Sequence, residues 1–142
     1  MKPLQSEQMG ITLMPVEMTS SPFSKFLSIE NGIRDGRKAY LLKYRKEFVG
    51  NPSIEAFHGG IVSAFIEMSA QLLLYSNEPL EEVREAETLT VDFLRPPVAK
   101  NGPLVAVPSI VRKGKNVSLL EVEVFQNDKL VATGKVIYLA KR

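Results

Sequence analysis

The chain has 142 residues, of which 44% are hydrophobic and 24% charged, as is ordinary for one globular domain with its own core. It has no cysteine and one histidine, which excludes disulfides, thiol nucleophiles and metal sites built from thiolates or several histidines. A net charge of +2 gives no reason to expect a nucleic acid or membrane partner. We see neither a signal-peptide core nor the ~20 apolar residues of a membrane span, so we expect a cytoplasmic protein.

Proline and glycine interrupt any regular period in residues 1–20. We therefore expect an extended N-terminal arm, followed by a single domain over residues 21–142. The apolar residues of the arm could pack on a partner subunit, or the arm could be a loose terminus. These residues are Met9, Ile11, Leu13 and Met14.

A short helix and two strands are predicted next. Ser21-Pro22 is typical of a helix start. The hairpin signal Asp35-Gly36 joins a predicted strand over residues 28–34 to a second strand over residues 38–48. A loop is expected at residues 50–53, which contain glycine, asparagine and proline.

The spacing of apolar residues predicts one long helix over residues 60–76. They lie on nearly all sides of it, which is typical of a helix buried in the centre of a domain. They are Ile61, Val62, Phe65, Ile66, Met68, Leu72, Leu73 and Leu74. The acidic stretch over residues 80–87 is expected at the surface.

Four further strands are predicted after the helix, over residues 87–94, 104–113, 117–126 and 130–140. Pro108 indicates an edge or a bulge in the second of them. Short turns between successive strands favour an antiparallel sheet. We therefore predict an α+β fold in which a curved antiparallel sheet of about six strands wraps around the central helix.

His58-Gly59-Gly60 stands where the long helix begins. Free N–H groups and the helix dipole favour negative charge at such a terminus. An amide aimed at a carbonyl oxygen would stabilise an oxyanion as it forms. The alternative is structural, with the glycines permitting a tight turn and the histidine packing.

Glu67 is an acid on an otherwise apolar helix, nine residues after His58. Such a carboxylate could act as a general base or as a nucleophile. Alternatively, it belongs to a polar stripe with Ser63, Ser69 and Gln71 that faces solvent.

Two further groups of polar residues are candidates for substrate binding. Asn51, Thr88 and Thr90 could hold a water molecule or a carbonyl group. The basic turn from Arg112 to Lys115 could bind the phosphates of a bulky carrier such as coenzyme A, or it could be a solvated hairpin tip.

Taken in order, these motifs resemble the acyl-CoA thioesterases of the phenylacetate-degradation (PaaI) type, which have the hotdog fold. The resemblance runs from about residue 41 to the C-terminus. It rests on Asn51, His58-Gly59-Gly60, Glu67, Val91-Asp92-Phe93-Leu94-Arg95-Pro96 and Val111-Arg112-Lys113-Gly114-Lys115.

The resemblance implies hydrolysis of an acyl- or aryl-CoA to a free acid and CoA, in a homodimer or homotetramer with active sites at the dimer interface. The Gly59 amide would polarise the thioester carbonyl, and Glu67 of the other subunit would activate water or attack the carbonyl. His58 and Asn51 would support the loop and the substrate, with Thr88 or Thr90 assisting the acid. Gly60 and Gln71 are further candidates for substrate contacts, and Arg112 and Lys115 for the nucleotide. CoA belongs to the substrate, so no cofactor or metal is implied.

The PaaI type usually has aspartate where this chain has Glu67, and a glycine near Glu55. Two alternative functions remain open at this stage. Glu67 and Gln71 also resemble the helix of hotdog hydroxyacyl dehydratases, which would hydrate an enoyl thioester. A non-catalytic hotdog module would instead bind acyl-CoA without turnover.

Overall fold

The computed structural model describes residues 11–13, 22–76 and 85–139. Most of the expected N-terminal arm lies outside these ranges, including Met9 and Met14, as does most of the acidic stretch after the long helix. Among the described residues, no helix is both long and apolar enough to cross a membrane.

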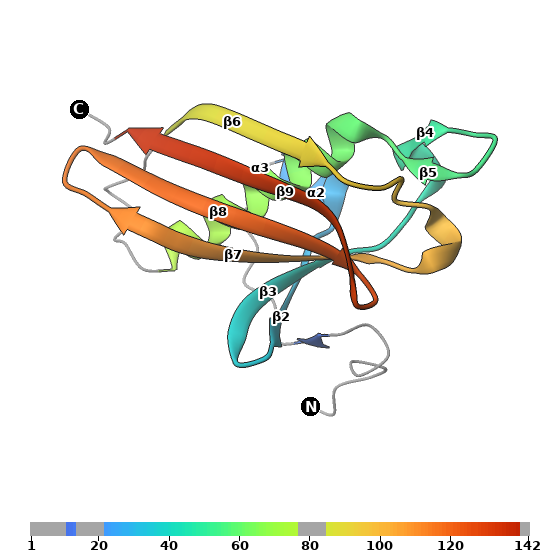
Figure 1. Cartoon of the computed structure of the whole chain (residues 1–142), viewed down its shortest axis with the longest axis horizontal. Helices are drawn as coiled ribbons and strands as arrows, with labels where there is room; N and C mark the ends of the chain where they lie inside the picture. Colours follow the sequence, from blue (N-terminus) through green and yellow to red (C-terminus); the bar gives the residue numbers. More distant parts are fainter. Residues whose placement is uncertain (1–10, 14–21, 77–84, 140–142) are drawn as a thin grey trace.

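One antiparallel sheet, in the order β1-β2-β3-β7-β8-β9-β6, curves around a long helix, α3 (Figure 1). The α+β hotdog prediction is thereby confirmed. All six predicted strands are present, and a two-residue strand, β1, adds a seventh. The strands of the sheet are β1 (Thr12–Leu13), β2 (Glu30–Arg34), β3 (Arg37–Leu42), β6 (Glu85–Phe93), β7 (Leu104–Lys113), β8 (Val117–Gln126) and β9 (Lys129–Leu139).

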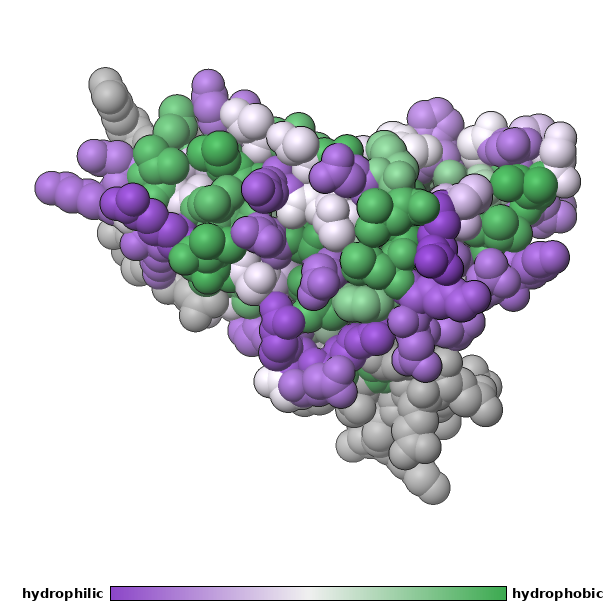
Figure 2. Space-filling model, in the orientation of Figure 1, coloured by the Kyte–Doolittle hydropathy of each residue, from purple (hydrophilic) through white to green (hydrophobic). Residues whose placement is uncertain are grey.

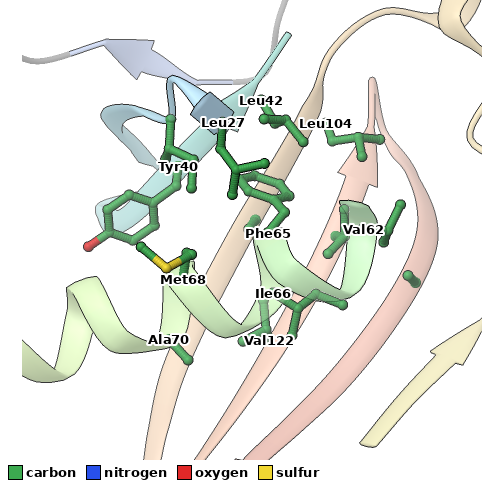
Figure 3. Close-up of a cluster of buried hydrophobic side chains, with 14 of the residues drawn as sticks. Leu27, Tyr40, Leu42, Val62, Phe65, Ile66, Met68, Ala70, Leu104 and Val122 are labelled. Atoms are coloured by element: carbon green, nitrogen blue, oxygen red, sulfur yellow. The ribbon is translucent and has the colours of Figure 1, made fainter. Parts of the chain in front are cut away.

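The helix α3 spans Gly59–Tyr75, within one residue of its predicted bounds. It lies against β3, β7, β8, β9 and β6, and its apolar residues fill the concave side of the sheet. Phe65 points toward Leu27 of the short helix α2 (Pro22–Leu27), and Ile66 lies beside Val122 (Figure 3). Each fully buried side chain of this size contributes ~1.5–3 kcal/mol, so the apolar faces of α3 hold the domain together.

Two hairpin turns confirm the turn signals. Asp35 and Gly36 have φ angles of 50° and 77°, as expected for the two-residue type I′ loop that suits the twist of a hairpin. The loop between β8 and β9 also has two residues, of which only Asn127 has a positive φ, of 54°.

The predicted strand over residues 38–48 was wrong in its second half, because β3 ends at Leu42. A 3₁₀ turn, η1 (Lys46–Phe48), follows and leads into β4 (Val49–Asn51), which pairs with β5 (Ala56–Phe57). Two tertiary contacts redirect the chain here. Tyr44 packs edge-on against Phe57, with 5.2 Å between ring centroids, and Phe48 is completely buried. The predicted loop at residues 50–53 therefore begins inside a strand.

Pro108 lies where β7 has a neighbour on one side only, because β3 pairs with β7 no further than Ala106. A register shift follows between Ile110 and Arg112. Both features that this proline indicated, an edge and a bulge, are confirmed.

Ile11 is the one apolar residue of the arm whose burial the structure describes, and it is 2% exposed. It packs on its own chain, with Ala39, Leu41, Val105 and Val107. Alternate residues of β3 and β7 contact α3, so this second cluster lies on the opposite side of the sheet. Figure 2 shows one face of the molecule, on which hydrophobic and hydrophilic side chains are interspersed.

Candidate active site

His58 is the N-cap of α3. Its imidazole Nδ1 accepts a hydrogen bond of 2.8 Å from the N–H of Gly60. Its own backbone N–H donates to the carbonyl of Phe48, which ties the helix start to the chain before β4. His58 therefore supplies the capping acceptor that serine or aspartate provides in most helices.

This cap leaves Gly59 with a free donor. The N–H groups of Ile61 and Val62 both donate to the carbonyl of His58, and the N–H of Gly60 is taken by the imidazole. Within the described residues the Gly59 N–H has no partner, and Gly59 is exposed. The positive end of the helix dipole thus presents one uncommitted N–H to solvent, which suits a carbonyl oxygen that is gaining negative charge.

A further glycine, Gly50, is essential to this arrangement and was not singled out from the sequence. A Cβ at Gly50 would lie 2.7 Å from the Cα of His58 and 3.2 Å from its backbone nitrogen. The absence of a side chain therefore lets β4 lie directly on the helix start. Only the tertiary contact shows that position 50 requires glycine, because a Gly-Asn-Pro sequence by itself is typical of an ordinary loop.

Asn51, the next residue, is exposed, and its Oδ1 accepts a 3.1 Å hydrogen bond from the N–H of Ser53. This local turn occupies the side-chain oxygen, so the Nδ2 group is the donor that Asn51 has to offer a ligand.

Glu67 is half-buried on α3, about two turns beyond Gly59. At roughly 1.5 Å per residue, the two positions are separated by about 12 Å along the helix axis. Ser63 stands between them, and its hydroxyl donates to the Gly59 carbonyl at 2.9 Å. The structure therefore does not bring Gly59 and Glu67 of one chain together around a single small group.

Beyond Glu67 the polar side of the helix continues through Gln71 to Tyr75. Gln71 Nε2 donates to the Tyr75 hydroxyl at 2.7 Å. From the sheet, the hydroxyl of Tyr138 donates to the backbone carbonyl of Glu67 at 3.2 Å. Tyr138 was not identified from the sequence as part of the site.

Thr88 and Thr90 lie on β6 and are exposed. Their neighbours Leu89 and Val91 pack against the core, and successive residues of a strand point to opposite faces. The two threonines therefore face away from α3, and the structure does not place them beside Glu67 of the same chain.

Arg112 and Lys115 are exposed, one at the end of β7 and the other in the turn before β8. That turn lies at the opposite end of the sheet from the start of α3 (Figure 1). The length of β8, about 30 Å, separates the basic turn from the end of the sheet nearest Gly59. These residues cannot serve a ligand held by the Gly59 amide of their own chain unless that ligand spans the sheet.

Two surface cavities, of about 570 and 290 Å³, are formed by described residues, and neither includes Gly59 or Glu67. Within the same part of the chain, no group of three potential metal-binding side chains gathers in one place.

Solved structures with this fold are similar to the chain over most of its length. The BH2602 protein of Bacillus halodurans, crystallised with CoA, is 23% identical, with a TM-score of 0.77 over 89% of this chain and 82% of that protein. A phenylacetic acid degradation-related protein of Ralstonia eutropha is 24% identical, with a TM-score of 0.74 over 85% and 92%. The E. coli PaaI protein of the phenylacetic acid degradation operon is 21% identical, with a TM-score of 0.73 over 87% and 86%. At these identities the likeness shows the fold.

Sequence comparison identifies the family. No match was found among curated proteins. The family model for the acyl-CoA thioesterase N-terminal domain matches residues 50–139, a segment that begins at the Gly50 contact and includes the whole of α3. The chain therefore belongs to the acyl-CoA thioesterase family, whose general reaction is hydrolysis of acyl-CoA thioesters.

Proposed function

We propose that this protein hydrolyses an acyl- or aryl-CoA to a free acid and CoA at two sites that two copies of the chain build together. The observation that carries the proposal is the uncommitted N–H of Gly59 at the start of a long helix, in a chain of the thioesterase family. The CoA bound to the Bacillus halodurans protein of the same fold supports a CoA ester as the ligand.

In this reaction the Gly59 N–H donates to the thioester carbonyl oxygen. The carbonyl carbon is attacked by water, from which Glu67 removes a proton, or by the Glu67 carboxylate itself. The carbonyl oxygen then becomes an oxyanion, and the amide stabilises it more strongly than it did the neutral carbonyl. Collapse of this intermediate breaks the C–S bond and expels the CoA thiolate. In the water route the thiolate takes up the proton that Glu67 removed, which gives the thiol and the free acid. In the carboxylate route it takes a proton from water, and a second water then hydrolyses the mixed anhydride, which releases the acid and restores Glu67.

Glu67 must come from a second copy. The attacking atom has to lie ~3–3.5 Å from the carbonyl carbon, whose oxygen is bound at Gly59. A glutamate about 12 Å along the same helix axis does not meet that condition. Two antiparallel α3 helices related by a twofold axis near Ser63 would place Glu67 of each copy beside Gly59 of the other.

The edge of the sheet supports this dimer. Strand β6 pairs only with β9, so its other side is a nine-residue edge that nothing in the described chain covers. Its last residue, Phe93, is 54% exposed and is followed by the exposed Leu94. A long uncovered edge strand is a template for pairing because its backbone N–H and C=O groups have no partner on that side, and two antiparallel β6 strands would continue the sheet across the dimer.

The other candidates take supporting roles in this proposal. His58 holds the helix start, Asn51 Nδ2 donates to the substrate or to water, and Gly60 and Gln71 line the approach. Arg112 and Lys115 of the second copy would bind the nucleotide of CoA. Thr88 and Thr90 have no role in it because they face the other side of the sheet. Pairs of dimers would form the tetramer.

The test is subunit complementation. Glu67→Ala and Gly59→Pro each remove one of the two groups, so each homodimer should lose thiol release across a panel of acyl- and aryl-CoA esters. A heterodimer of the two variants, co-expressed with different tags, has one intact composite site. It should recover about half of the wild-type rate.

The unmixed variants and a wild-type dimer carrying both tags are the controls. A heterodimer as inactive as its parents would contradict the composite site. Binding of acyl-CoA to the wild type without any thiol release would contradict the hydrolase and favour a non-catalytic module.

A further inference from the structure

Tyr138 connects the sheet to the helix at the position of Glu67. It lies on β9, is 1% exposed, and its hydroxyl donates to the backbone carbonyl of Glu67 at 3.2 Å. A helical carbonyl already accepts the N–H four residues later, but its oxygen has a second lone pair. The bond from Tyr138 is therefore an addition to the helix, made from outside it.

The donor stands on a rigid support. The backbone of Tyr138 is paired on one side with Ser118 of β8 and on the other with Ala86 of β6. A residue held on both sides in a sheet has little freedom to shift, so the hydroxyl marks a fixed point against which α3 can be located.

The surroundings keep this hydroxyl a donor. Burial, and then the negative charge of Glu67, raises the pKa of Tyr138 well above the usual range for tyrosine. The phenol therefore keeps its proton at neutral pH and remains a donor.

We propose that Tyr138 is a positioning residue, which sets the height and rotation of α3 so that Glu67 projects at the angle the second copy requires. This role rests on the proposed function. Tyr138 does not touch the substrate. A displacement of ~1 Å in a catalytic carboxylate can slow the reaction by ~10²-fold. The hydrogen bond from Tyr138 restrains such a displacement directly, because it is made to the backbone of Glu67 itself.

Tyr138→Phe tests this role because it removes the hydroxyl and keeps the buried ring. The matched control is Tyr40→Phe, at a second buried tyrosine that contacts the core (Figure 3) and makes no hydroxyl hydrogen bond among the described residues. We expect kcat of Tyr138→Phe to fall by ~10- to 10²-fold with KM unchanged, and Tyr40→Phe to keep kcat within about twofold.

A double-mutant cycle separates positioning from general support of the fold. In a Glu67→Ala background there is no carboxylate to position, so Tyr138→Phe should leave the residual rate unchanged. The same fractional loss in both backgrounds would overturn the proposal, as would an unchanged kcat in the single variant.

Amide hydrogen exchange tests the tether without reference to activity. The Gln71 N–H shares its acceptor with Tyr138 and should exchange about fivefold faster in Tyr138→Phe than in Tyr40→Phe, the effect of losing one hydrogen bond. Equal exchange rates would overturn the tether. A wild type that hydrolyses no thioester would instead refute the proposed function, so the two failures are distinguishable.

Discussion

Gly59→Pro removes one hydrogen-bond donor and little else. Gly59 is the first residue of α3 after its N-cap, where proline is favoured because the missing N–H has no helical partner. His58 has φ −63° and ψ 137°, within the extended region that a residue before proline adopts. A Cβ here would meet only Phe93, at 3.4 and 3.7 Å, which is ordinary contact.

The expected effect follows from the role of that N–H. Loss of one oxyanion donor costs ~10²–10³-fold in kcat, or about 2.7–4 kcal/mol of transition-state stabilisation. The free energy of unfolding should change by less than about 1 kcal/mol, because the donor has no partner within the described chain and the backbone already suits proline.

The assay is thiol release from the best acyl-CoA ester of the panel, with Gly59→Ala as the matched control. Alanine adds the Cβ but keeps the N–H, so its kcat should remain within a few-fold of wild type. Urea unfolding of both variants separates lost chemistry from lost structure. If the proline variant turned over as fast as the alanine variant, the Gly59 amide would not be the oxyanion donor.

Substitutions at three further positions test the packing around the candidate site. Ser69→Ala should stabilise the protein by about 1 kcal/mol, because the Ser69 hydroxyl is buried with no hydrogen-bond partner among the described residues. A loss of stability in urea unfolding would show that it has one. Gly134→Ala should destabilise by ~1–3 kcal/mol, because the new Cβ would lie 2.6 Å from Ile66 Cγ2 in a packed core; wild-type stability would refute that close approach. His58→Ala should lower the free energy of unfolding by about 1 kcal/mol, because the Gly60 N–H loses its capping acceptor. His58→Asn should keep both stability and kcat, because asparagine can also cap a helix. A large fall in kcat with asparagine would indicate that the imidazole itself takes part in the reaction.

Local signals predicted most of the elements. The helix over residues 60–76 and the strands over residues 104–113 and 117–126 agree with α3, β7 and β8 within a residue, because their hydrophobic periods are long and turn residues bound them. The strand predicted over residues 38–48 was too long. Its alternating pattern continues past Leu42, but the strand ends there and Tyr44 packs against Phe57 instead. The local sequence around Tyr44 carries no information about this contact, because Phe57 belongs to a different segment.

By itself, the sequence determined the fold class, the helix start with its glycine pair, and the acid on an apolar helix. Each depends on residues close together along the chain. Only the tertiary structure decided that the Gly59 N–H has no partner among the described residues, that Thr88 and Thr90 face away from the helix, and that Tyr138 and Gly50 contact Glu67 and His58. These properties depend on which strand lies beside which, and on how closely backbones approach. The residues concerned are separated along the chain by eight positions for Gly50 and His58 and by 71 for Glu67 and Tyr138. Packing of the whole core sets such contacts, and periodicity along one segment carries no information about them.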